Sequence, residues 1–146
     1  MRHGDIKLDA GAFPDGWESM KRCVDRAGIE GVLLGVHTLS NFSTTNDSYV
    51  TPVPDERLAK VGNSKITDTI DAEQTEIKVA EPVWFNQMNN NTLRTVVVGS
   101  ELIQYRTVSQ EAPWRLMDCK RGAFETMAQK HAAGETISKL MDHSYR

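Results

Sequence analysis

A polar loop in the first half of the chain holds the side chains whose types could do chemistry. His37 follows an apolar run at residues 32–36, and Asp47 and Tyr49 lie farther along the loop. A carboxylate that accepts hydrogen bonds from hydroxyl groups, placed beside an aromatic face, suits a sugar ring. Asp9, at the end of an expected first strand, could share this task. Each also has a structural interpretation, because His37 can bond to loop backbone and Asn-Asp-Ser clusters often form turns.

Two tryptophans in the second half, Trp84 and Trp114, could form an exposed platform for stacking against sugars, together with Phe85. Large aromatic side chains in a small β domain are more often part of the core. We therefore favour a core position for all three.

A metal site could be imagined from His131, Asp118 and His143. These residues would lie on three different elements and contain no closely spaced pair of ligands, so the sequence predicts no metal and no other cofactor. Arg121 and Gly122 are better explained as turn residues, with Gly122 supplying a positive φ that other residues resist.

Composition narrows the classes of partner. The chain has 146 residues and a net charge of −3, which argues against nucleic acid or an anionic membrane as the main partner. No apolar run reaches the length of a membrane span, and the N-terminus lacks the apolar core of a signal peptide. The chain is therefore cytosolic or a piece of a longer exported protein. Cys23 and Cys119 lack metal-binding spacing and are interpreted as small buried hydrophobes, with a disulfide between them left open.

The first 60 residues read as an α/β segment. A short strand is expected at residues 5–10, and a helix at about 17–27, with Asp15 as N-cap and Gly28 as its stop. The continuous apolar run at 32–36 predicts a strand covered on both faces, which completes a βαβ unit. One apolar stripe marks the helix: Trp17, Met20, Val24 and Ala27.

From about residue 64 the hydrophobic period changes to two, which predicts a compact β-sandwich or open barrel. A tight turn at residues 99 and 100 predicts a hairpin that places Val97 near Leu102. A short helical piece is expected at 125–134, stopped by Gly134. The strand candidates are residues 75–80, 93–99, 101–109, 114–119 and 135–142.

Two stretches resemble known families. "DAGAFPDGWESMKRCVDRAGIEGVLLGVHT" resembles a barrel βα unit of bacterial glycoside hydrolases related to the α-galactosidase-like clan, and "NDSYVTPVPDERL" resembles a loop of glycosidase-like proteins from polysaccharide-degrading bacteria. Separately, "SELIQYRTVS…WRLMDCKRGAFETMAQKHAAGETISKL" is similar to a small β module of phage tail and fibre proteins that also occurs as an insert in extracellular enzymes. The frame of this module is "E-I-Y", then "RG", then "T…A…H..G", then a final apolar strand.

Together the resemblances imply an α+β chain, with a partial βαβ segment of a TIM-like barrel followed by a small β-sandwich or open β-barrel module. The expected divisions are 1–63 for the barrel segment, 64–143 for the inserted module and 144–146 for the return to the barrel. The paired carboxylates of a glycosidase are missing, so no catalytic residue is expected in this fragment.

The resemblances also imply partners and a location. The parent protein would be a periplasmic or secreted glycoside hydrolase, and the partners would be a carbohydrate and the remainder of the parent chain. An unpartnered barrel strand could also bring two copies of the fragment together. The alternative is a carbohydrate-binding or phage-fibre-like assembly module without enzymatic activity.

Overall fold

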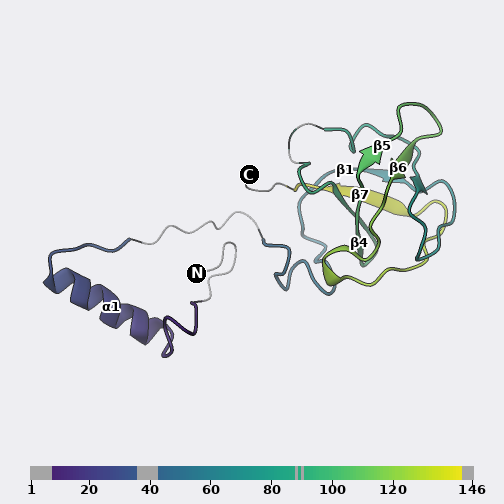
Figure 1. The fold of residues 1–146 in the computed structure, drawn as a ribbon. Coiled ribbons are helices and arrows are strands. Elements are labelled where there is room, and N and C mark those ends of the chain that lie inside the picture. The colour runs from purple at the N-terminus through teal and green to yellow at the C-terminus, as the bar shows by residue number, and fades with distance from the viewer. Residues whose placement is uncertain (1–7, 36–42, 88, 90, 143–146) are drawn as a thin grey trace. The chain divides into compact units, whose positions relative to one another are not determined.

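The computed structural model describes residues 8–35, 43–87, 89 and 91–142 (Figure 1). The chain divides into two compact units, residues 1–47 (unit 1) and residues 48–146 (unit 2). The described residues form one α-helix, in unit 1, and antiparallel sheets in unit 2, which makes the chain α+β. No helix in the described part of the chain is long and apolar enough to cross a membrane.

The helix of unit 1, α1 (Trp17–Ile29), confirms the expected helix and extends two residues beyond it. The expected N-cap is wrong. Gly16 occupies that position with a φ of 59°, and no side chain caps the helix. The carboxylate of Asp15 instead forms an exposed ion pair with Arg22, one turn into the helix.

The end of α1 and its apolar stripe also differ from expectation. Gly28 lies inside the helix, and Gly31, with a φ of 73°, follows its end. No residue of α1 is buried, and Trp17 and Val24 of the stripe are exposed. Within unit 1, Met20 and Ala27 of the stripe are therefore only partly buried, and the rest of the apolar face is exposed.

The expected buried strand at residues 32–36 is wrong over its described part, residues 32–35. Val32 and Leu34 are about half exposed, and Leu33 is 95% exposed. The N–H of Val32 donates to the carbonyl of Ala27, which continues the helix end. A parallel strand needs a neighbouring strand for its backbone groups, and the described residues of unit 1 provide none. Of the expected strand at 5–10, only residues 8–10 are described, and they form no strand.

Unit 2 contains two antiparallel sheets. The first has the order β1 (Lys60–Lys65), β7 (Thr136–Leu140), β3 (Thr95–Val98) and β4 (Glu101–Gln104). The second has the order β2 (Ile77–Lys78), β6 (Arg115–Met117) and β5 (Thr107–Val108).

The hairpin prediction is confirmed, because β3 pairs with β4 and Val97 lies opposite Leu102. Every strand candidate of the second half contains a strand, but β1 was not expected. Its sequence "KVGNSK" is too polar to show alternation, and it becomes a strand because β7 pairs with its length. β1 also spans the expected division between residues 63 and 64.

The helical piece expected at 125–134 is wrong. A short 3-10 turn at Ala123–Glu125 is followed by extended chain, and His131 forms an isolated bridge with Ile70. The apolar residues of 125–134 are few, so this segment is held by polar contacts rather than by an amphipathic face.

A single main core joins the two sheets of unit 2. A second, smaller cluster joins Val50 and Leu58 to Leu102 and Leu140, so the chain from residue 48 packs as part of unit 2. The main core consists of Ile66, Ile70, Ile77, Val79, Phe85, Val96, Val98, Ile103, Tyr105, Val108, Leu116, Cys119 and Ile137.

Candidate functional site

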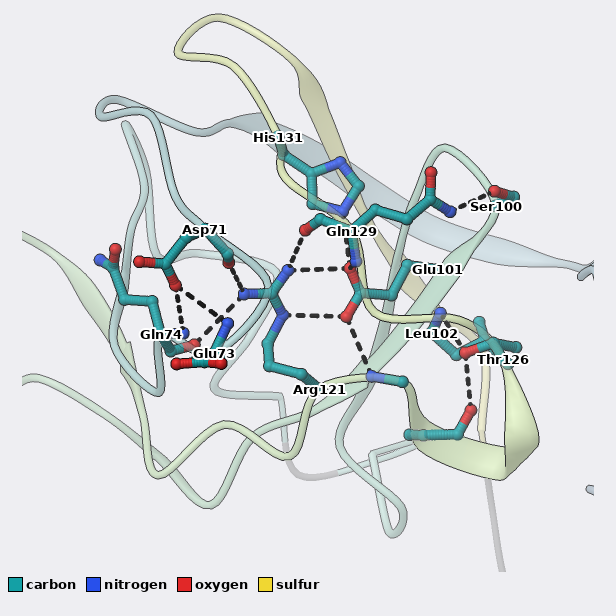
Figure 2. Close-up of polar contacts among 12 residues, drawn as sticks. Asp71, Glu73, Gln74, Ser100, Glu101, Leu102, Arg121, Thr126, Gln129 and His131 are labelled. Carbon is teal, nitrogen blue, oxygen red and sulfur yellow. Dashed lines mark hydrogen bonds and ion pairs between the residues drawn. The ribbon is translucent and has the colours of Figure 1, made fainter.

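A buried carboxylate, that of Glu101, is the centre of the densest polar cluster in unit 2 (Figure 2). Glu101 opens β4 directly after the hairpin turn, and its side chain is fully buried. Its Oε1 accepts hydrogen bonds from Arg121 Nε and the N–H of Gly122, both at 2.9 Å. Its Oε2 accepts from Arg121 Nη2 at 2.8 Å and the N–H of Gln129 at 3.1 Å, and lies 2.7 Å from His131 Nε2.

The guanidinium of Arg121 also makes several hydrogen bonds. Figure 2 shows it between Glu101 on one side and the segment of Asp71 and Gln74 on the other. Besides its two bonds to Glu101, it donates to the carbonyls of Asp71, of Gln74 at 3.3 Å and of Gln129 at 2.6 Å. The side chain is only 5% exposed. Arg121 is thus the buried partner of Glu101, and its interpretation as a turn residue missed this role.

His131 connects the cluster to a second carboxylate. Its Nδ1 lies 3.1 Å from Glu135, whose other oxygen accepts the N–H of Ala132 at 2.7 Å. The hydrogen bond of Ala132 holds the pKa of Glu135 below its usual range. The backbone of His131 exchanges hydrogen bonds with Ile70, which fixes the ring over Glu101.

The expected positive φ of Gly122 is confirmed at 57°. A Cβ at this position would lie 2.8 Å from the carbonyl oxygen of Thr126. Thr126 in turn accepts, through its hydroxyl, the N–H of Leu102 at 3.0 Å. Glycine is therefore needed for the N–H of Gly122 to reach Glu101.

Two opposing effects set the pKa of Glu101. Burial alone would raise it, because an apolar environment disfavours the charged form. Hydrogen bonds from Arg121, Gly122, His131 and Gln129 outweigh burial and hold the pKa below its usual range. The carboxylate stays ionised, out of solvent, with both oxygens occupied. The cluster is therefore a structural lock rather than a general acid or base.

The lock predicts a loss of stability in acid. A carboxyl group with a lower pKa in the folded than in the unfolded state contributes stability above the unfolded pKa, here about 4.5, and loses it as the pH falls through the folded value. We expect the free energy of unfolding of unit 2 to be constant at neutral pH and to fall below about pH 4.5. Chemical denaturation at several pH values measures this. Equal stability at pH 7 and pH 3 would contradict the ionised state of Glu101.

A second buried ion pair lies at the end of β7. Lys139 Nζ lies 2.6 Å from Asp142, whose two oxygens also accept the N–H groups of Leu93 at 2.7 Å and Thr95 at 2.8 Å. Burial lowers the pKa of Lys139. This pair ties the start of β3 to the end of β7 and is not open to a ligand.

The three sugar-binding candidates before residue 48 do not come together in the described structure. His37 lies outside the described residues. The Asp9 carboxylate accepts the N–H groups of Gly11 at 3.0 Å and Ala12 at 2.9 Å, as a turn aspartate does. Asp47 ends unit 1, and its N–H donates to Thr44.

Tyr49 belongs to unit 2 and is about half exposed. The guanidinium carbon of Arg57 lies 5.2 Å from the centre of its ring, so a cation already occupies one face. Arg57 also holds Asp55 through two bonds of 2.8 Å and lowers the pKa of Asp55 to about 2. The N–H of Asp55 donates to the carbonyl of Tyr49, which closes the segment on itself.

Of the three aromatic candidates, Phe85 lies in the core as expected, whereas Trp84 and Trp114 are only partly buried. Phe85 is 1% exposed and meets Tyr105 edge to face. Trp114 is partly buried and packs against the main core. Trp84 lies over β1, because a Cβ at Gly62 would meet its indole at 2.2 Å.

The described residues contain no group of three His, Cys, Asp or Glu side chains that could hold a metal ion. Asp118 is exposed, His131 is bound to carboxylates, and His143 lies outside the described residues. Cys23, in unit 1, and Cys119, in unit 2, are both free thiols in the structure. Cys23 is exposed, against expectation, while burial raises the pKa of Cys119 to about 12.

Comparison of the chain with protein-family models, with curated proteins and with solved structures found no match.

Proposed function

We propose that this chain is part of a larger glycoside hydrolase-like protein, in which unit 2 is an accessory β module without catalytic activity. Unit 1 would be completed by other residues of the parent chain, as a partial βα segment of a TIM-like barrel. The segment around Asp47 and Tyr49 would approach the carbohydrate. The parent protein would act outside the cytoplasm, on polysaccharide or oligosaccharide.

The uncovered apolar face of unit 1 is the observation that carries this proposal. α1 has an amphipathic sequence but no buried residue, and Leu33 and Ile29 are 95% and 83% exposed. The exposed large apolar side chains of unit 1 are Trp17, Val24, Ile29, Val32, Leu33 and Leu34. Soluble proteins rarely leave large apolar patches in water. This supports a unit whose core is supplied from elsewhere, which a barrel segment requires.

The chemistry of the carboxylates supports the accessory role of unit 2. Glycosidic cleavage needs an acid and a second carboxylate on opposite sides of the scissile bond. Glu101 and Asp142, the buried carboxylates of unit 2, are already occupied by backbone N–H groups and by Arg121 or Lys139.

We expect the purified chain to release no chromophore from aryl-glycosides, because one βα loop cannot hold both the acid and the second carboxylate across the scissile bond. The assay uses a panel of α- and β-linked nitrophenyl sugars, with the Asp47→Ala variant as the matched control. Turnover by the native chain that Asp47→Ala abolishes would contradict the proposal.

The alternative is an assembly module like those of phage fibres. The lock residues Glu101, Arg121 and His131 belong to the frame that resembles such modules, and unit 2 has a core of its own. Two measurements separate the candidates. Chemical-shift changes during an oligosaccharide titration monitored by NMR would favour the carbohydrate role. A stable oligomer in analytical ultracentrifugation, without any sugar-dependent shift, would favour assembly.

A further inference from the structure

An open cavity of about 330 Å³ on unit 2 is not used by either buried ion pair. Its lining comes from three segments: the chain before β3, the end of β4 with the two residues that follow it, and the chain after β6. The lining residues are Thr92, Leu93, Arg94, Gln104, Tyr105, Arg106, Asp118 and Lys120.

Three of the lining side chains are cations, which is unusual in a chain with a net charge of −3. Arg94, Arg106 and Lys120 are exposed, and none of them forms an ion pair with another described residue. Asp118 is the one carboxylate among the lining residues, which leaves a local excess of two positive charges. Such a concave cluster of uncompensated cations attracts an anion.

Backbone hydrogen bonds hold the three cations in register. The N–H of Tyr105 donates to the carbonyl of Arg94 at 3.1 Å, and Gln104 and Lys120 exchange two hydrogen bonds of 3.1 and 2.7 Å. The N–H of Arg106 donates to the carbonyl of Met117 at 2.9 Å. Because consecutive residues of one segment make these contacts, the fold sets the spacing of the backbone positions that carry the cations before any ligand arrives.

Two of the lining residues adopt a backbone conformation that side chains seldom take. Arg94 has a φ of 49° and Asp118 a φ of 52°. A left-handed arginine is uncommon and costs free energy, and such residues gather at binding sites. Arg94 and Asp118 both line the cavity, so both strained positions contribute to the same site.

We propose that this cavity binds the carboxylate or sulfate group of an acidic sugar chain. The guanidinium forks of Arg94 and Arg106 match an oxyanion in two-pronged hydrogen bonds. Lys120 adds a third positive charge, and Asp118 can accept a hydrogen bond from a neighbouring hydroxyl group. The sugar part of this proposal rests on the proposed function, whereas the anion part rests on the cavity alone.

A nucleic acid backbone is a poorer occupant of this cavity. Phosphate chains are bound by an extended row of cations, and the affinity grows with the number of phosphates neutralised. Here three cations surround one cavity on an acidic protein, which suits one oxyanion at a time.

The test titrates the full chain with trigalacturonate, a sulfated galacto-oligosaccharide, neutral galactotriose, inorganic sulfate and a short oligothymidylate, by calorimetry and by NMR. We expect an acidic sugar to shift the amide signals of residues 92–94, 104–106 and 118–120. Arg94→Gln and Arg106→Gln should each weaken its binding about tenfold or more. The tighter of the two acidic sugars identifies the oxyanion as carboxylate or sulfate.

Lys130→Gln is the matched control. Lys130 is exposed and lies in unit 2, and its substitution removes one positive charge outside the cavity. Lys130→Gln should leave the affinity for the acidic sugar unchanged. All three variants should have the same melting temperature as the native chain. If Lys130→Gln loses as much affinity as the two arginine variants, the effect comes from the net charge of the chain, and the proposed site is overturned. Equal binding of neutral galactotriose would overturn the anion site but leave the proposed function standing. Binding of inorganic sulfate or oligothymidylate alone would keep an anion site and overturn the carbohydrate assignment, and no shift with any probe would overturn the proposal entirely.

Discussion

Glu101→Gln is expected to lower the free energy of unfolding of unit 2 by about 3–5 kcal/mol, the usual cost of removing one partner of a buried ion pair. The amide keeps the size of the carboxyl group but loses its charge, so the guanidinium of Arg121 is left buried without a counter-ion. The amide nitrogen would also face donors, because Arg121, Gly122 and Gln129 all direct N–H groups at the carboxylate. Urea denaturation followed by tryptophan fluorescence measures the loss.

The control is Glu111→Gln, which makes the same chemical change at an exposed position of unit 2. It should alter stability by no more than about 0.5 kcal/mol. If Glu101→Gln matches Glu111→Gln, the cluster is not the lock that its geometry indicates.

Local patterns in the second half predicted the elements that local sequence determines. The turn at residues 99 and 100 fixed the hairpin, because a two-residue turn leaves one register for β3 and β4. Gly122 was identified by its need for a positive φ. β1 could not be found in the same way, since its polar residues become a strand only where β7 offers a partner.

The error at residues 32–36 shows the limit of reading hydrophobicity alone. Val32, Leu33 and Leu34 have the composition of a buried strand, but a strand also requires neighbours for its N–H and C=O groups. The described part of unit 1 has none, so these residues follow the helix as exposed chain. The apolar pattern therefore indicates that the segment would be buried if neighbouring strands were present, and the described part of unit 1 contains no such strands.

The polar clusters could not be predicted from the spacing of residues in the sequence, for a related reason. Glu101 is 20 residues from Arg121 and 30 from His131, and only the tertiary fold brings these two side chains within 3 Å of its carboxylate. The frame of the resembled module contains these three residues, which was the signal that could have joined them. Arg94, Arg106 and Lys120 come together in the same way, through pairs of backbone hydrogen bonds across three segments.

Gly62→Ala is expected to lower the free energy of unfolding of unit 2 by roughly 3 kcal/mol, the upper part of the range for overpacking a fitted site. A Cβ at this position would lie 2.2 Å from Trp84 Cδ2 and 2.5 and 2.6 Å from the two ring atoms bonded to it. Nearly equal distances to three such atoms place the new methyl directly over the face of the indole. The ring must therefore leave β1, which removes its contact with the strand and exposes more of its surface.

A double-mutant cycle isolates this contact. With Trp84→Ala in the background, Gly62→Ala should cost little, because the atoms it would meet are gone, so the two changes should be strongly non-additive. A platform role for Trp84 predicts the opposite result: Gly62→Ala would leave stability intact and change oligosaccharide affinity by moving the indole. Loss of stability that disappears in the Trp84→Ala background would instead assign Trp84 to the support of β1 and leave sugar recognition to other residues of the chain.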